Sequence, residues 1–153
     1  MTHDEIITAI PKTARALNQI ADRLSDEQLR QRRNDGHWSF KEVIGHLRDV
    51  AAVYNERIQV IGQVANATLA PFDPEKLVAA GGYNSLPAAR MIAELEGLER
   101  SITQLLSGLD EAGWQRGGVH PTRGTLTIEQ LASNYVEHAN DHVDDLWERI
   151  GSC

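Results

Sequence analysis

The sequence predicts an all-α fold, a four-helix bundle, and three observations support this prediction. Four segments of about 20 residues repeat apolar side chains at helical spacing, so each would form one apolar stripe. Residues that favour helix N-termini precede several of these segments. Val, Ile and Thr nowhere alternate with polar residues for long enough to predict a strand. Helices that each bury one stripe pack together as a bundle, and we expect a single domain over residues 1–153.

The first helix is expected over residues 4–24. Its apolar stripe consists of Ile6, Ile10, Ala14, Leu17, Ile20 and Leu24. Pro11 has no backbone N–H to donate, so the helix should kink or restart there. Ser25, followed three residues later by Gln28, predicts a short helical turn with reciprocal capping bonds.

The second helix should begin after Ser39, because Glu42 stands where its side chain can complete a capping box. Its stripe contains Val43, His46, Leu47, Val50, Tyr54 and Ile58. Prolines and glycines in residues 66–84 exclude one continuous helix in that stretch.

The third helix is expected to open at Ser85, with Pro87 tolerated in its first turn. Its stripe consists of Ile92, Leu95, Leu98, Ile102, Leu105 and Leu109. Gly108 is a plausible stop, and the glycine-rich residues 110–127 predict a loop.

Thr127 and Gln130 predict a capping box for the fourth helix, which should run to about Ile150. Its stripe consists of Ile128, Leu131, Tyr135, His138, His142, Asp145 and Arg149. The loops on both sides of the third helix are long, and either could cross over the bundle. One crossover would make the second and fourth helices antiparallel.

Composition excludes several classes of function. The net charge is −7 and the acidic residues are scattered, so a nucleic-acid partner is not expected in the absence of a basic stripe. No apolar run approaches the roughly 20 residues of a membrane helix, and the N-terminus lacks signal-peptide features. The single cysteine, Cys153, cannot form an internal disulfide. We therefore expect a cytoplasmic protein.

Three histidines interrupt the apolar stripes of the second and fourth helices. His138 and His142 are four residues apart, so their rings project together and could bind one metal ion. His46 would supply a third nitrogen if the two helices are antiparallel. His46 lies about two turns from the start of its helix and His142 about two turns from the end of its own, so both would then lie at a similar depth in the bundle. Core histidines are more often hydrogen-bonded than metal-bound, and periodicity leaves both readings open. A metal would satisfy all three buried rings at once.

Two segments, "HWSFKEVIGHLRDV" and "VHPTRGTLTIEQLASNYVEHANDHVDDL", resemble those of the DinB/YfiT-like family of small four-helix-bundle metalloproteins. The resemblance implies a divalent metal ion, nickel or zinc, held by His46, His138 and His142 and completed by water. The family often has Asp where this chain has Ala139, and Gln where it has Asp145. Both departures affect groups that would support the ligands.

Three neutral ligands leave a metal with its full charge and an open position. Such a metal could acidify a water molecule or bind a substrate thiolate. The resemblance favours an S-transferase that uses a low-molecular-weight thiol, with a metal-dependent hydrolase as the first alternative. A non-catalytic metal-binding stress or interaction protein is the second alternative. We expect a small-molecule substrate, such as a thiol, and a homodimer is compatible with the sequence.

Two carboxylates could assist. Asp49 follows His46 by three residues and could take a proton from water or a thiol, unless it is an ordinary surface carboxylate. Asp145 follows His142 by three residues and could orient a ligand ring, unless it faces solvent.

Other candidates come from the same helical faces. Arg57 shares the helical angle of His46 and could anchor an anionic substrate, although a side chain that reaches out to solvent is the simpler interpretation. Tyr54 and Tyr135 could line a pocket or pack in the core. No metal role is expected for His3, His37 and His120, and the tryptophans Trp38, Trp114 and Trp147 are expected to be packing anchors.

Overall fold

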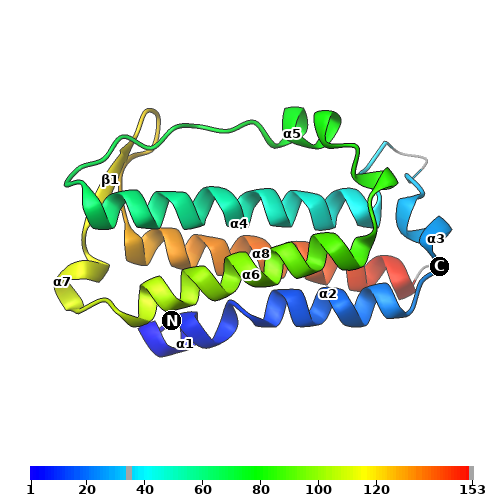
Figure 1. The fold of residues 1–153 in the computed structure, drawn as a ribbon, viewed down its shortest axis with the longest axis horizontal. Helices are drawn as coiled ribbons and strands as arrows, with labels where there is room; N and C mark the ends of the chain where they lie inside the picture. The colour runs from blue at the N-terminus through cyan, green and yellow to red at the C-terminus, as the bar shows by residue number, and fades with distance from the viewer. Residues whose placement is uncertain (34–35, 152–153) are drawn as a thin grey trace.

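The structure is a computed structural model that describes residues 1–33 and 36–151. Its long helical segments lie side by side (Figure 1): α1 (His3–Ala9) continuing into α2 (Lys12–Asp22), α4 (Phe40–Gln63), α6 (Ala88–Ser107) and α8 (Ile128–Gly151). The shorter elements are α3 (Asp26–Arg30), α5 (Pro74–Gly81), the 3-10 helix η1 (Tyr83–Ser85), α7 (Glu111–Trp114) and the strands β1 (Gly117–His120) and β2 (Gly124–Thr127). The four-helix bundle predicted from the sequence is confirmed. Cys153 lies outside the described residues.

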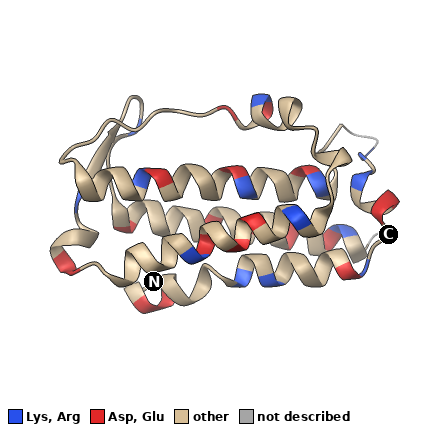
Figure 2. Cartoon of the chain, viewed as in Figure 1, with Lys and Arg blue, Asp and Glu red and all other residues tan. Residues whose placement is uncertain are grey.

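Helices α4 and α8 run in opposite directions, as predicted (Figure 1). The crossover is the segment between α4 and α6, which carries α5 and returns along the outside of α4. Acidic and basic residues are interspersed along the helices (Figure 2). Among the described residues, no helix combines the length and the apolar composition that crossing a bilayer requires.

The predicted helix starts are confirmed where capping residues mark them. Ser39 accepts a hydrogen bond from the backbone N–H of Glu42 at 3.1 Å, and the Glu42 carboxylate accepts one from Ser39 N–H at 3.0 Å. Thr127 and Gln130 exchange equivalent bonds at the start of α8. Pro11 separates α1 from α2, as its missing N–H predicts.

Two predictions about the third helix and its following loop are wrong. The helix begins at Ala88 with Pro87 as its N-cap, because Ser85 belongs to the preceding 3-10 turn. Residues 117–127 form an antiparallel hairpin in which Gly117 pairs with Thr127. These strands have four residues each, too few to show alternation.

The close approach of the crossover segment explains Gly118 in the hairpin. A side-chain carbon on Gly118 would lie 2.8 Å from Leu69, so only glycine fits there without displacement. Leu69 N–H donates to the Val119 carbonyl at 2.9 Å, and Val119 N–H donates to the Ala67 carbonyl at 2.8 Å. The hairpin therefore fastens the start of the crossover segment to the end of the bundle.

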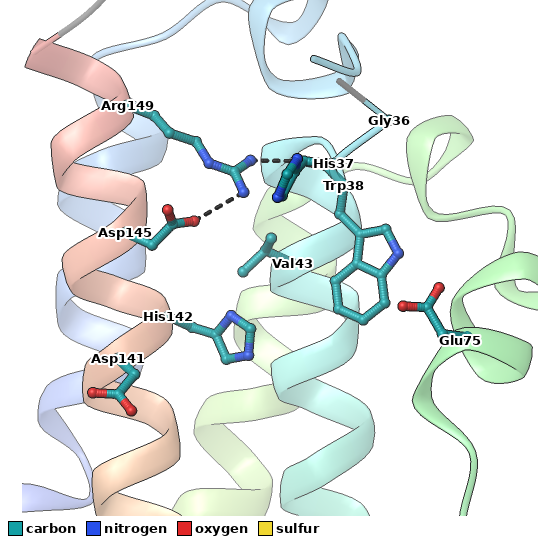
Figure 3. A pocket seen from close by; sticks show the side chains of 9 residues that line it. All are labelled: Gly36, His37, Trp38, Val43, Glu75, Asp141, His142, Asp145 and Arg149. Atoms are coloured by element: carbon teal, nitrogen blue, oxygen red, sulfur yellow. Dashed lines mark hydrogen bonds and ion pairs between the residues drawn. The ribbon is translucent and has the colours of Figure 1, made fainter. Parts of the chain in front are cut away.

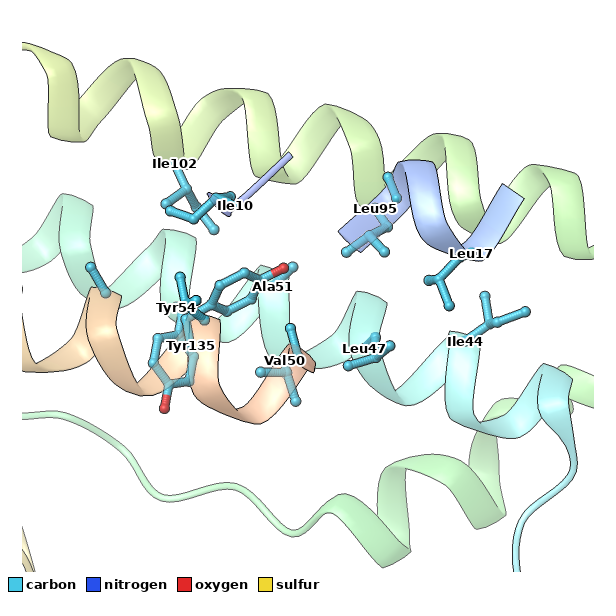
Figure 4. Packing of buried hydrophobic residues seen from close by; sticks show 14 of the residues in the cluster. Ile10, Leu17, Ile44, Leu47, Val50, Ala51, Tyr54, Leu95, Ile102 and Tyr135 are labelled. Carbon is cyan, nitrogen blue, oxygen red and sulfur yellow. The ribbon is translucent and has the colours of Figure 1, made fainter. Parts of the chain in front are cut away.

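The core fills the space between the long helices (Figure 4). Most predicted stripe residues are buried in it, and Tyr54 and Tyr135 contact each other there with ring centroids 5.6 Å apart. Glu99 of α6 is also buried, with only 1% of its surface exposed. Its carboxylate accepts hydrogen bonds from Tyr135 Oη at 2.6 Å and from Ala14 N–H at 3.2 Å.

Candidate metal centre

Three histidines from two antiparallel helices converge on one point. His46 lies on α4, and His138 and His142 lie one turn apart on α8. The Nε2 atom of His138 lies 3.2 Å from Nε2 of His46 and 3.2 Å from Nε2 of His142. The predicted set of three ligands is therefore brought together by the fold.

Burial favours the neutral form of all three imidazoles. Burial, together with the nearby His142 and His138, lowers the pKa of His46 to about 3. Burial also lowers the pKa of His138. Burial and the neighbouring His138 lower the pKa of His142 to about 4, although Asp145 and Asp141 act in the opposite direction. Neutral rings carry the lone pairs that bind a metal ion.

The spacing of the nitrogens fits a divalent cation. Imidazole nitrogens bind zinc at about 2.0–2.1 Å, which places two ligands of a tetrahedral site about 3.3 Å apart. The separations of 3.2 Å between Nε2 atoms match that value. Three neutral imidazoles suit zinc and nickel better than the oxygen-seeking magnesium or calcium.

The second ring nitrogens of two of the histidines have no hydrogen-bond acceptor among the described residues. Nδ1 of His46 and Nδ1 of His138 are buried, and no described residue accepts a hydrogen bond from them. Metal-binding histidines usually donate this second N–H to a carboxylate or carbonyl. Ala139, at the position where the family often has Asp, is buried and has no acceptor to offer on its side chain.

A pocket of about 490 Å³ lies beside His142 (Figure 3). Trp38 and Val43 provide apolar surface on one side, and Asp145 and Arg149 face them from α8. The remaining lining residues are Gly36, His37, Glu75 and Asp141. A small molecule in this pocket would lie next to the histidine cluster.

Trp38 connects the pocket to the cluster. Its ring lies 4.9 Å from that of His46, and its carbonyl accepts a hydrogen bond from Arg149 Nη1 at 2.6 Å. Arg149 Nη2 also pairs with Asp145 at 2.8 Å. Sequence reasoning treated Trp38 only as a packing anchor and gave Arg149 no role. Two features of the sequence could have indicated these roles. Trp38 stands directly before the Ser39 cap of α4, and Arg149 stands four residues after Asp145 on α8.

The structure brings Asp145 to the pocket but places the other predicted helpers elsewhere. Asp49 accepts hydrogen bonds from Tyr83 Oη at 2.5 Å and from Arg48 at 3.4 Å. It is thus neither a free surface carboxylate nor a lining residue of the pocket. Its catalytic role stays a prediction.

Tyr54, Tyr135 and Arg57 do not line this pocket either. The two tyrosines pack in the core. Arg57 is buried rather than extended into solvent, so the simpler interpretation of its side chain was wrong. His3, for which no metal role was expected, stacks on Trp114 with ring centroids 3.9 Å apart.

Comparison with known proteins places this fold and site in a family. The profile of the DinB superfamily matches residues 9–146. The chain belongs to the DinB superfamily. One relative in the superfamily is the candidate metal-dependent hydrolase YfiT of Bacillus subtilis. It is 25% identical over 146 residues, which cover 95% of this chain and 82% of YfiT.

Two further comparisons agree with this membership, and a third shows the fold alone. A candidate metal-dependent hydrolase of Geobacillus thermodenitrificans is 30% identical, covering 90% of this chain and 78% of its own length. The solved structure of YfiT, described as having an unusual four-helix bundle topology, superposes with a TM-score of 0.89 over 97% of this chain and 87% of YfiT. A mycothiol-dependent maleylpyruvate isomerase shares the fold, with a TM-score of 0.75 at 11% identity over 95% of this chain and 61% of its own.

Proposed function

We propose that this DinB-superfamily protein is a metal-dependent hydrolase whose nickel or zinc ion is held by His46, His138 and His142. The observation that carries the proposal is the convergence of three neutral Nε2 atoms beside an open pocket. Three protein ligands next to a pocket are typical of catalytic zinc sites, whereas structural sites are closed by four. The open side therefore favours an enzyme over the non-catalytic alternative.

A divalent ion bound by three uncharged ligands supplies Lewis acidity toward a substrate oxygen and lowers the pKa of water. The chain supplies the rest of the site. Trp38 and Val43 would bind an apolar part of the substrate. The Asp145 carboxylate lies on the wall beside His142, where it could hold a proton released during hydrolysis.

Hydrolysis takes precedence here over the thiol transfer expected from the sequence. Relatives that match over most of their length carry the name of metal-dependent hydrolase. The thiol-dependent relative is matched at 11% identity, which supports a shared fold and not a shared reaction. Thiol transfer therefore remains an outcome that the experiment must be able to detect.

The experiment compares the zinc- or nickel-loaded protein with its His142→Ala variant on chromogenic aryl esters, amides and phosphate esters. A parallel assay supplies a low-molecular-weight thiol and an electrophilic aryl halide. We expect hydrolysis that falls more than about 100-fold in the variant, because losing even an outer hydrogen bond of a ligand costs about 10- to 100-fold. His120→Ala, which changes the half-buried histidine at the end of β1, is the matched control.

Each result has a definite meaning. Hydrolysis that depends on His142 but not on His120 supports the proposal. Metal-dependent activity confined to the thiol assay would contradict hydrolysis and favour the S-transferase. Tight metal binding without turnover in either assay would favour the metal-binding role.

A further inference from the structure

Arg57 is a buried cation without an anionic partner in the part of the chain that the structure describes. It is 7% exposed and lies on α4 beneath the crossover segment. Its Nη2 donates to the Ala70 carbonyl at 2.8 Å, but its Nε is buried and no described residue accepts a hydrogen bond from it. Among the described residues, no carboxylate oxygen lies within 4.0 Å of its guanidinium nitrogens.

Two aromatic rings enclose the guanidinium. Its central carbon lies 5.8 Å from the ring centre of Tyr54 and 5.7 Å from that of Phe72. Such contacts favour a cation, yet they do not replace the hydrogen bonds that its N–H groups made in water. A guanidinium in this setting is suited to an oxyanion, which can accept two parallel N–H bonds.

A second arginine lies in the hairpin turn next to this segment. The parallel bridge between Thr68 and Val119 places the start of the crossover segment beside β1, and Arg123 follows β1 in the turn. Burial is the main cause that lowers the pKa of Arg57, and the charge of Arg123 lowers it further, whereas Tyr54 and Glu56 act in the opposite direction. Arg123 is exposed in the turn between β1 and β2, and it too has no ion pair with a described carboxylate. Like charges repel, and an anion bound near both arginines would offset this repulsion. This pairing is unexpected in a chain with a net charge of −7.

Residues 70–72, which cover Arg57, separate it from solvent by a single exposed stretch of chain. Ala70 and Pro71 are exposed, and Phe72 is half-buried. The hairpin bonds end at Leu69, and α5 begins only at Pro74. The residues over Arg57 are thus held between two fixed points, and Arg57 itself donates a hydrogen bond to Ala70 from beneath.

We propose that Arg57 and Arg123 form a binding site for a small-molecule oxyanion, a carboxylate or phosphate group, beneath residues 70–72. The site is distinct from the metal centre. Arg57 follows His46 by 11 residues on α4, which is about 16 Å along the helix axis. The inference does not depend on the proposed hydrolase activity.

The test is isothermal titration calorimetry with inorganic phosphate and, separately, with succinate, at constant ionic strength set by chloride. Both are run on the wild-type chain and on Arg57→Lys, Arg123→Gln and Arg100→Gln. Arg100 is an exposed arginine of α6 paired with Glu96, so its variant removes one positive charge from a different place. His138→Ala reports on binding at the metal centre. Circular dichroism checks that each variant is folded.

We expect saturable binding of at least one anion that weakens about tenfold or more in Arg57→Lys, because lysine cannot present the paired donors. Arg123→Gln should weaken binding several-fold, while Arg100→Gln and His138→Ala should leave it within about twofold. Binding by phosphate alone would identify a phosphate group, and binding by succinate alone a carboxylate. The exposed position of Arg123 keeps the test valid even if Arg57→Lys fails to fold.

Two results would overturn the inference. One is the absence of saturable binding of either anion up to about 10 mM, a range in which even weak specific sites are detected. The other is binding that survives both arginine variants and disappears in His138→Ala, since that would assign the anion to the metal centre. In either case Arg57 only fastens the crossover segment through Ala70.

Discussion

Replacing Glu99 by glutamine should remove a large pH dependence of stability. Burial raises the pKa of Glu99 to about 7, although hydrogen bonds from Tyr135 and Ala14 act in the opposite direction. The raised pKa means that the folded protein favours the protonated carboxyl. The stabilisation from this proton is complete below the ordinary pKa of 4.5 and is lost as the pH rises through about 7.

The magnitude follows from the displacement of the pKa. At about 1.4 kcal/mol per pH unit, a change from 4.5 to about 7 corresponds to about 3 kcal/mol in the free energy of unfolding. Glutamine is neutral at every pH and keeps one acceptor for Tyr135 or Ala14. The variant should therefore gain about 3 kcal/mol relative to wild type between pH 4.5 and pH 8.

The assay is urea unfolding of the metal-free protein at several pH values, with Glu99→Gln compared with wild type. The histidines titrate in both proteins, so their contribution cancels in the difference. Glu137→Gln, which changes an exposed carboxylate on α8, is the control and should not reproduce the pH-dependent gain of Glu99→Gln. A Glu99→Gln difference that does not change with pH would refute a protonated, buried Glu99.

Three further predictions concern packing and metal binding. Gly45→Ala should destabilise the fold by about 1–3 kcal/mol in thermal unfolding, because the added carbon would lie 2.2 Å from the Tyr83 ring. Gly97→Ala, with nothing within 4 Å of the added carbon, should instead stabilise by up to about 1 kcal/mol; equal effects would contradict the packing at Gly45. Because the pKa of His46 is lowered to about 3 and that of His142 to about 4, protons should compete little with metal between pH 7 and pH 5. Competition titrations should give nearly constant zinc affinity there, and a steep fall would show that the rings are protonated.

Local signals in the sequence carried the prediction of the bundle. The capping pairs at Ser39 and Thr127 depend on residues three positions apart, so they can be recognised without knowledge of the fold. The histidine cluster was predictable because His138 and His142 are one turn apart, and because a single crossover fixes the direction of α4 relative to α8.

What could not be predicted depends on contacts between distant segments. The hairpin is too short and too rich in glycine to show a strand pattern. Its strand β1 also forms hydrogen bonds with residues 67–69, which are distant in the sequence. Arg57 is buried because the crossover segment folds back over it, which helical periodicity on α4 cannot reveal. Glu99 occupies an apolar stripe of α6, and only the fold shows that it receives hydrogen bonds from α2 and α8.

Metal content tests the central claim most directly. Protein purified without an affinity tag, and then supplied with zinc or nickel and desalted, is analysed for bound metal beside His138→Ala and the control His120→Ala. We expect close to one metal ion per chain in wild type and in His120→Ala, and loss of the metal in His138→Ala. Absence of bound metal in the wild type after both ions have been supplied would contradict a metal centre formed by His46, His138 and His142.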